Sequence, residues 1–406
     1  MKKMMNVLKK IMAVLFPVAA AVALTVSCEQ VQGPEMKIGK TVLIYMAADN
    51  DLASFARKNL EDIKNGYLPE FFNEGKGDVL LVYTDIRGET PKLIRLSAGR
   101  PGEVYEEVLV EYEEDQNSMS DSVMSAVLSY AAELFPSENA GLVLWSHGTG
   151  WLPEGYYSNP VSMSDDGMVI PMSVEEDPFA AYVKSFGSDG SSEMDIKTLA
   201  EALPMRYSYI VFDACLMGGV EVAYEVREKC DYFLGSAAEI LAEGMPYASI
   251  TEDLMKGDRQ ALESVCRKYY EHYIDDGATI ALVDTRSLER LATACADIAA
   301  SGRDAVASLD MSSIQGYFRR NKHWFYDLGD LMSRLATPEQ YSTFTSALEA
   351  AVPYRLSTEE FRIGGHNQFD IKTFSGLSTY VPNPENSYLD DYYRTLAWNQ
   401  AVRMVR

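Results

Sequence analysis

The stretch that decides the fold class is Tyr209-Ile210-Val211-Phe212-Asp213-Ala214-Cys215-Leu216-Met217-Gly218-Gly219. Its apolar run predicts a buried strand that stops at Cys215, and apolar residues then recur at helical spacing from Met217 to Tyr224. The order strand, tight turn, helix places the thiol at the carboxyl edge of a sheet. In open α/β sheets, that edge is where ligands bind.

An earlier stretch has the same organisation, Gly141-Leu142-Val143-Leu144-Trp145-Ser146-His147-Gly148-Thr149-Gly150-Trp151. Two parallel strands would bring His147 and Cys215 to one edge, where an imidazole can generate the reactive thiolate. Gly148 would let a backbone N–H approach a developing oxyanion. Either residue alone is more often structural, as an inert buried cysteine or a satisfied histidine. Together they are the minimum set for acyl transfer.

Strands and helices alternate along the first half of the chain. Apolar strands are predicted at 41–47 and 78–84, and helices at 52–63 and 120–135. This alternation predicts an α/β fold with a mostly parallel central sheet flanked by helices. A charged hairpin-like region at 92–113 interrupts it. The segment from Trp151 to Asp195, rich in Ser, Pro, Gly and Asp, is too irregular to be core, and loops of such length are usually functional or disordered.

The chain is predicted to divide into four parts: a signal peptide (1–27), a tether (28–38), a catalytic domain (39–284) and a mainly helical C-terminal region (285–406). Further strands are expected at 232–237 and 278–283. A late strand at 376–381 is expected to return to the main sheet.

These motifs resemble those of the clostripain-like cysteine peptidases, which are relatives of caspases, legumains and gingipains. The motifs are Trp145-Ser146-His147-Gly148-Thr149-Gly150-Trp151, Asp213-Ala214-Cys215-Leu216-Met217-Gly218, Tyr45-Met46-Ala47-Ala48-Asp49-Asn50-Asp51-Leu52 and Ser375-Gly376-Leu377-Ser378. The resemblance implies a caspase-like fold and a cysteine endopeptidase that works through a thioester. Cys215 would be the nucleophile, His147 the acid and base, and the N–H groups of Gly148 and Cys215 the oxyanion hole. The sequence identifies no third orienting residue.

The resemblance also implies cleavage after arginine or lysine, which requires a carboxylate in the pocket. Asp213 matches a family motif position, and Glu239 lies where the following strand would reach the same pocket. Each has an alternative, because Asp213 is able to cap the turn and Glu239 to be a solvated strand-end charge. Residues 240–247 are less acidic than a strongly basic-specific member would require.

Several clostripain-like peptidases cut themselves after a basic residue in the loop beyond the histidine. Between Trp151 and Asp195 the only basic residue is Lys184. We therefore expect Lys184 to be a processing site. The alternative is that Lys184 is only a side chain on a strand that leads to Phe186 and has no role in processing.

The N-terminus indicates export. Four lysines precede an apolar run at 11–26, which is shorter than a membrane span and is typical of a signal peptide. The run ends in Leu24-Thr25-Val26-Ser27-Cys28, which resembles a bacterial lipoprotein box although Thr25 departs from the usual aliphatic residue. We expect Cys28 to carry lipid that anchors the protein in the cell envelope, facing the periplasm or exterior. A plain cleaved signal is the alternative.

Charge and composition restrict the partners. The formal net charge is −24, and removal of 1–27 makes it more negative because that segment has four lysines and no acidic residue. This charge disfavours nucleic acid and leaves lipid as the means of membrane attachment. Protein or peptide substrates are the expected partners. The five cysteines form no disulfide framework, and Cys230, Cys266 and Cys295 are expected to be buried packing residues.

No cofactor is expected. The four histidines form no zinc-binding pair, and calcium is an alternative that no EF-hand-like spacing supports. A serine hydrolase would need a G-x-S-x-G turn, which the chain lacks. The rival from another class is a catalytically silent surface lipoprotein that uses the peptidase scaffold for binding.

Overall fold

A nine-stranded sheet forms the centre of the computed structural model, which describes residues 37–72, 75–112, 116–157, 159–163, 169–171, 192–319, 323–382 and 387–406. The segment predicted to be a signal peptide, Cys28 and Lys184 lie outside these residues. The strand order is β12-β10-β9-β8-β5-β1-β2-β3-β4. The strands are β1 (Lys37–Ala48), β2 (Lys76–Ile86), β3 (Lys92–Ala98), β4 (Val104–Glu111), β5 (Ala140–Trp145), β8 (Tyr207–Asp213), β9 (Cys230–Gly235), β10 (Thr279–Asp284) and β12 (Tyr354–Ser357).

Five central strands, β9-β8-β5-β1-β2, pair in parallel, and the outer pairs on both sides are antiparallel. The central strands are buried almost throughout because helices cover both faces, which explains their continuous apolar runs. The predicted mostly parallel α/β sheet is confirmed.

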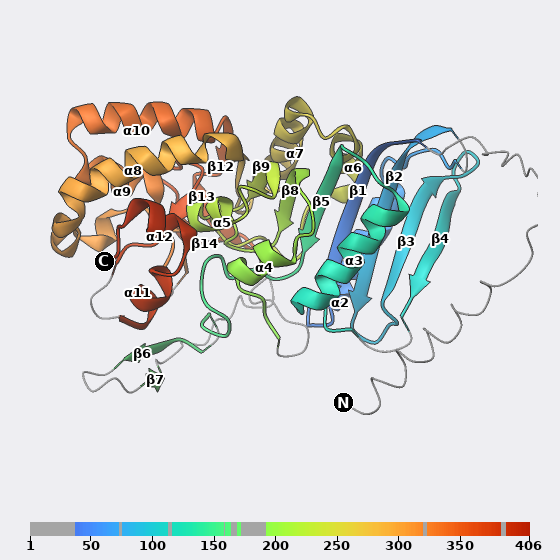
Figure 1. Ribbon diagram of the computed structural model, residues 1–406, viewed down its shortest axis with the longest axis horizontal. Coiled ribbons are helices and arrows are strands. Elements are labelled where there is room, and N and C mark those ends of the chain that lie inside the picture. Colours follow the sequence, from blue (N-terminus) through green and yellow to red (C-terminus); the bar gives the residue numbers. More distant parts are fainter. Residues whose placement is uncertain are drawn as a thin grey trace, which may run out of the picture. The chain divides into compact units, whose positions relative to one another are not determined.

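Helices α3 (Asp121–Leu134) and α4 (Ile196–Ala202) pack together on one face of the sheet, the near face in Figure 1. On the other face, α2 (Ala53–Asn65) packs against α6 (Tyr247–Lys256), which contacts α7 (Arg259–His272). Two side chains identify this second face. Trp145 Nε1 of β5 donates to Asn59 Oδ1 in α2, and Tyr209 Oη of β8 donates to the Leu254 carbonyl in α6.

The C-terminal region is mainly helical, as expected, and lies at the β12 end of the sheet (Figure 1). Its helices are α8 (Leu288–Gly302), α9 (Leu328–Leu335), α10 (Pro338–Ala351), α11 (Ser387–Tyr393) and α12 (Ala397–Val402), and α12 also contacts α5 (Val220–Glu225). Small two-stranded sheets pair β6 (Val161–Met163) with β7 (Val169–Pro171), β11 (Tyr326–Asp327) with β15 (Ser378–Thr379), and β13 (Glu360–Ile363) with β14 (His366–Asp370).

Three expectations need correction. The C-terminal strand that joins the main sheet is β12, whereas 376–381 contributes only the short β15, which pairs with β11. The first part of the 151–195 segment is core, because Trp151, Leu152, Tyr156 and Tyr157 are buried. Strand β1 begins at Lys37, inside the range expected for the tether.

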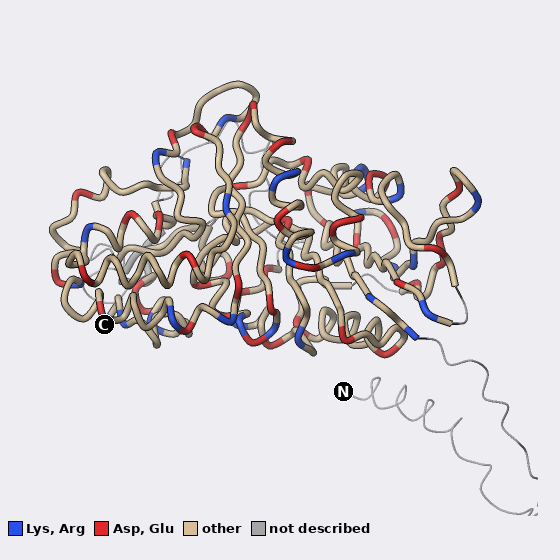
Figure 2. The backbone as a smooth tube through the Cα atoms, turned by 90° about the horizontal axis from the view of Figure 1, so that it is seen from above, with Lys and Arg blue, Asp and Glu red and all other residues tan. Residues whose placement is uncertain are grey.

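Acidic and basic residues are interspersed along the described backbone (Figure 2), so the acidic excess belongs to many elements. Among the described helices, none has the length and hydropathy needed to cross a membrane.

Candidate active site

The ends of three parallel strands lie level at one edge of the sheet. Met46 of β1 is in register with Trp145 of β5, which is in register with Asp213 of β8. His147 and Cys215 each follow two residues later, so the register brings both to the carboxyl edge. Gly148 lies against the backbone of Cys215: a Cβ on Gly148 would be 2.3 Å from the Cys215 carbonyl oxygen and 3.0 Å from its nitrogen. Only glycine allows the two turns to approach so closely.

His147 is oriented by a residue that sequence reasoning missed. Its Nε2 lies 2.8 Å from Oδ1 of Asp51, in the turn between β1 and α2. The hydrogen bond with His147, helped by the charges of His147 and Arg87, lowers the pKa of the Asp51 carboxyl although burial opposes the shift. The imidazole is buried and the Asp51 side chain is largely exposed. The sequence signal that could have identified Asp51 is its position just after strand β1, which ends at the same sheet edge as β5 and β8.

Cys215 is fully buried. Its Sγ donates to the Ile240 carbonyl at 3.4 Å and accepts from the Ile240 N–H at 3.0 Å. The next residue, Leu216, has a left-handed φ of +62°, a conformation that costs a branched side chain energy. The turn is held by backbone bonds from Leu216 N to the Ala238 carbonyl and from Gly218 N to the Ser236 carbonyl. The segment after β9 therefore encloses the thiol.

Glu239 is buried in an ion pair within the chain. Arg319 Nε donates to its Oε2, Arg319 Nη2 donates to Oε1 at 3.1 Å, and Tyr157 Oη donates to Oε1 at 2.9 Å. Both charged side chains are about 5% exposed. Burial, the negative charge of Glu239 and the hydrogen bond to it raise the pKa of Tyr157 well above its usual value. The alternative of a solvated strand-end charge is wrong, because Glu239 lies inside the protein.

Asp213 is also buried, on the α6 face. Its Oδ2 accepts hydrogen bonds from Tyr247 Oη at 2.9 Å and from the Met245 N–H at 3.2 Å. These contacts join the end of β8 to the start of α6. The two candidate substrate-binding carboxylates thus have different partners: Asp213 contacts Tyr247 and Met245, and Glu239 faces Arg319.

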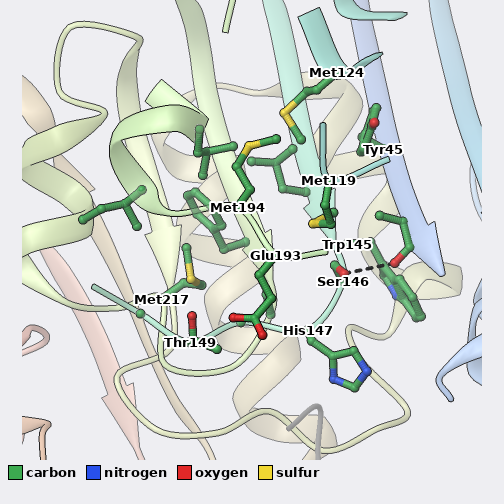
Figure 3. Close-up of a pocket in the computed structure, with 18 residues that line it drawn as sticks. Tyr45, Met119, Met124, Trp145, Ser146, His147, Thr149, Glu193, Met194 and Met217 are labelled. Atoms are coloured by element: carbon green, nitrogen blue, oxygen red, sulfur yellow. Dashed lines mark hydrogen bonds between the residues drawn. The ribbon is translucent and has the colours of Figure 1, made fainter. Parts of the chain in front are cut away.

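A cavity of about 70 Å³ opens beside His147 on the face of the sheet that α3 and α4 cover (Figure 3). It is lined by apolar side chains of the strand ends, of α3 and α4, and of the segments next to these elements, and four of them are Met119, Met124, Met194 and Met217. His147, Thr149 and Glu193 form its polar margin. Glu193 accepts a hydrogen bond from the Gly155 N–H at 2.9 Å. Burial, with a contribution from Glu154, raises the pKa of the Glu193 carboxyl to about 7.

The remaining described cysteines fit the expectation of packing residues. Cys230, Cys266 and Cys295 are buried, outside any disulfide, and burial raises the pKa of each thiol. In the described part of the chain, no three His, Cys, Asp or Glu side chains are close enough together to hold a metal ion.

Comparisons with known proteins agree with this architecture. The model of the clostripain family, Peptidase_C11, matches residues 44–176 and 173–402. An X-ray structure of an inactive zymogen C11 protease from Parabacteroides distasonis is 33% identical, with a TM-score of 0.75 over 89% of this chain and 97% of that one. A secreted C11 cysteine protease from Bacteroides thetaiotaomicron, solved with an irreversible peptide inhibitor, is 30% identical, with a TM-score of 0.73 over 90% and 98%. Among proteins with curated descriptions, none is significantly similar.

The fold and the paired strand-end motifs define a caspase-like cysteine peptidase. The chain belongs to the clostripain family, as the family match over most of its length shows, and is a cysteine-type endopeptidase of that family.

Proposed function

We propose that the protein cleaves peptide bonds through a Cys215–His147 dyad. The observation that carries this proposal is the register of β5 and β8, which places both residues at one sheet edge with Gly148 against Cys215. His147 takes the proton of the Cys215 thiol as Sγ attacks the carbonyl carbon, and the C–N bond then breaks as His147 gives that proton to the leaving amine. Water then hydrolyses the thioester with His147 as the base. No metal ion or cofactor enters this reaction.

Asp51 and the backbone assist this chemistry. Because Nε2 of His147 contacts Asp51, Nδ1 is the nitrogen that exchanges a proton with the thiol and the amine. The N–H groups of Gly148 and Cys215 belong to turns in direct contact and would stabilise the oxyanion. Cys215 must leave its contacts with Ile240 to reach a substrate, so the described conformation is a resting one.

The dyad is tested with His147→Ala and Cys215→Ala, using exposed His272→Ala as the control. Loss of a member of a nucleophile–base pair lowers kcat by roughly 10⁴-fold or more. Peptide hydrolysis should therefore vanish in the first two variants and persist in the control. Near-normal hydrolysis by His147→Ala would contradict the assignment.

We further propose cleavage after lysine or arginine. Asp213 and Glu239 flank the thiol, and either carboxylate would pair with a substrate cation. For Glu239 this requires that Arg319 leave it. Hydrolysis of a peptide library separates the possibilities, because a preference for small or apolar residues before the cut would exclude a basic pocket.

Lys184 is the proposed processing site. Cleavage there would give two fragments, the second beginning at Ser185, whereas Cys215→Ala would stay whole. An intact chain with full activity would contradict processing at this residue.

We also propose that the protein is exported and anchored through lipid on Cys28. Labelling with a clickable fatty acid should be lost in Cys28→Ser, and equal labelling of both proteins would contradict the anchor. The competing function, a silent lipoprotein that only binds, predicts that a thiol-directed activity probe labels wild type and Cys215→Ala equally.

A further inference from the structure

The two faces of the sheet differ at the point where the candidate nucleophile lies. Successive side chains of β8 alternate between the faces. Asp213 contacts Tyr247 of α6, and Phe212 lines the cavity bordered by α3 and α4. His147 lines the cavity, and Cys215 follows Asp213 by two residues. A substrate that crosses this edge therefore meets a carboxylate on one face and an apolar cavity on the other.

An extended peptide presents successive side chains in opposite directions. If the residue before the scissile bond points toward Asp213, the residue after it points toward the α3/α4 face. The position of His147 independently indicates that the residue after the scissile bond lies on the cavity side. His147 protonates the leaving amine, so the leaving segment lies beside His147, and the wall of the cavity includes residues 147–150.

We propose that the cavity binds the side chain of the residue that follows the scissile bond, and that it selects an apolar side chain such as Met or Leu. This inference rests on the proposed dyad and goes beyond it by naming a second specificity pocket. The walls are apolar, and four methionines surround the space in Figure 3. Methionine is flexible and adapts to different apolar groups, so the pocket is able to adjust to side chains of differing shape.

The polar residues at the margin of the cavity add discrimination by charge to the discrimination by apolar character. Glu193 and His147 lie where an acidic side chain would enter, and Glu193 would repel it when ionised. An apolar side chain leaves both groups at the margin and fills the interior. Aspartate after the scissile bond should therefore be the poorest of the natural residues tested, below alanine.

The test uses quenched fluorescent peptides that differ only in the residue after the scissile bond, with Leu, Ala or Asp there. The residue before it is the one found by library screening. A blocked methyl ester of that same residue serves as the reference substrate because its leaving group, methanol, cannot reach the cavity. We expect kcat/KM for the Leu peptide to exceed that for the Ala peptide by at least about 10- to 200-fold, the range for a single extra methylene in a hydrophobic pocket.

The variant is Met194→Ser, which places a hydroxyl in the cavity wall, and the control is Met205→Ser, an equally half-buried methionine outside it. Met194→Ser should reduce the Leu/Ala ratio at least tenfold while leaving ester hydrolysis unchanged, and Met205→Ser should match wild type. Equal cleavage of Leu and Asp peptides, or equal ratios in the two variants, would overturn the pocket. Failure to hydrolyse even the ester would overturn the dyad itself, and the inference with it.

Discussion

The two strand ends that carry the candidate catalytic residues are built differently. Cys215 is fully buried, with its sulfur against both backbone groups of Ile240, and the adjacent Glu239 is paired with Arg319. His147 is held from outside by the exposed Asp51 and borders an apolar cavity. Under the proposed mechanism, the cysteine end would control whether the thiol is accessible, and the histidine end would protonate the leaving group and bind the residue after the scissile bond.

The largest expected effect tests the enclosure at the cysteine end. Arg319→Met leaves Glu239 buried without its counterion, which should cost about 3–5 kcal/mol of unfolding free energy. Arg206→Met removes an exposed pair with Asp231 and should cost about 0–1 kcal/mol. Urea denaturation of both variants measures the difference. Equal small losses would mean that the Glu239–Arg319 pair does not hold this end together.

Asp213→Asn separates the two candidate carboxylates. If Asp213 binds the substrate cation, the variant loses a charge-assisted contact, and kcat/KM for lysine peptides should fall by about 10- to 150-fold, equivalent to roughly 1.5–3 kcal/mol. Hydrolysis of peptides with an uncharged residue before the cut should change much less. An unchanged lysine preference would transfer the role to Glu239.

Asp51→Asn tests the histidine end. The amide keeps the shape but removes the charge that favours an oriented, protonated imidazole, so kcat should fall by about 10- to 100-fold with little change in KM. The pH–kcat profile should shift as well, because the charge next to His147 is lost. Asp49→Asn, a half-buried neighbour paired with Arg87, is the matched control. A loss confined to stability would assign Asp51 a structural role only.

The smallest effect concerns pH. With the pKa of Glu193 at about 7, the carboxyl is largely neutral at pH 6 and ionised at pH 8. His147 and Glu154 are the titratable groups nearby, and loss of a proton from Glu193 or from His147 makes the margin more negative as pH rises, so Glu193→Gln is needed to separate the two contributions. The ratio of kcat/KM for Lys over Leu after the scissile bond should therefore rise a few-fold from pH 6 to 8. A ratio that rises equally in Glu193→Gln would exclude this carboxyl as the cause.

The comparison also explains what the sequence could predict. The strand ends at His147 and Cys215 follow apolar runs, and the parallel pairing of β5 and β8 follows from strand–helix alternation. The contact of Asp51 with His147 was hidden because 96 residues separate them and no spacing rule links a turn residue to a later strand end. Arg319 was equally hidden, since nothing marks one of many arginines as the partner of Glu239. Strand β12 was missed because four residues, all only partly buried, carry a weak apolar pattern.

The strand order determines where the chain could be cut into two pieces without disrupting the central sheet. Residues up to 145 form one side of the sheet, with the strand order β4-β3-β2-β1-β5. Residues from 207 form the other side, with the order β8-β9-β10-β12. Each side of the sheet is therefore built from one continuous part of the chain. The boundary is the β5–β8 ladder, covered on one side by the α3–α4 contact and on the other by α2 and α6. A break in the connecting segment would convert one polypeptide into a non-covalent heterodimer without altering a single strand pair. His147 and Cys215 would then belong to different subunits, and the two halves become candidates for separate expression and reassembly.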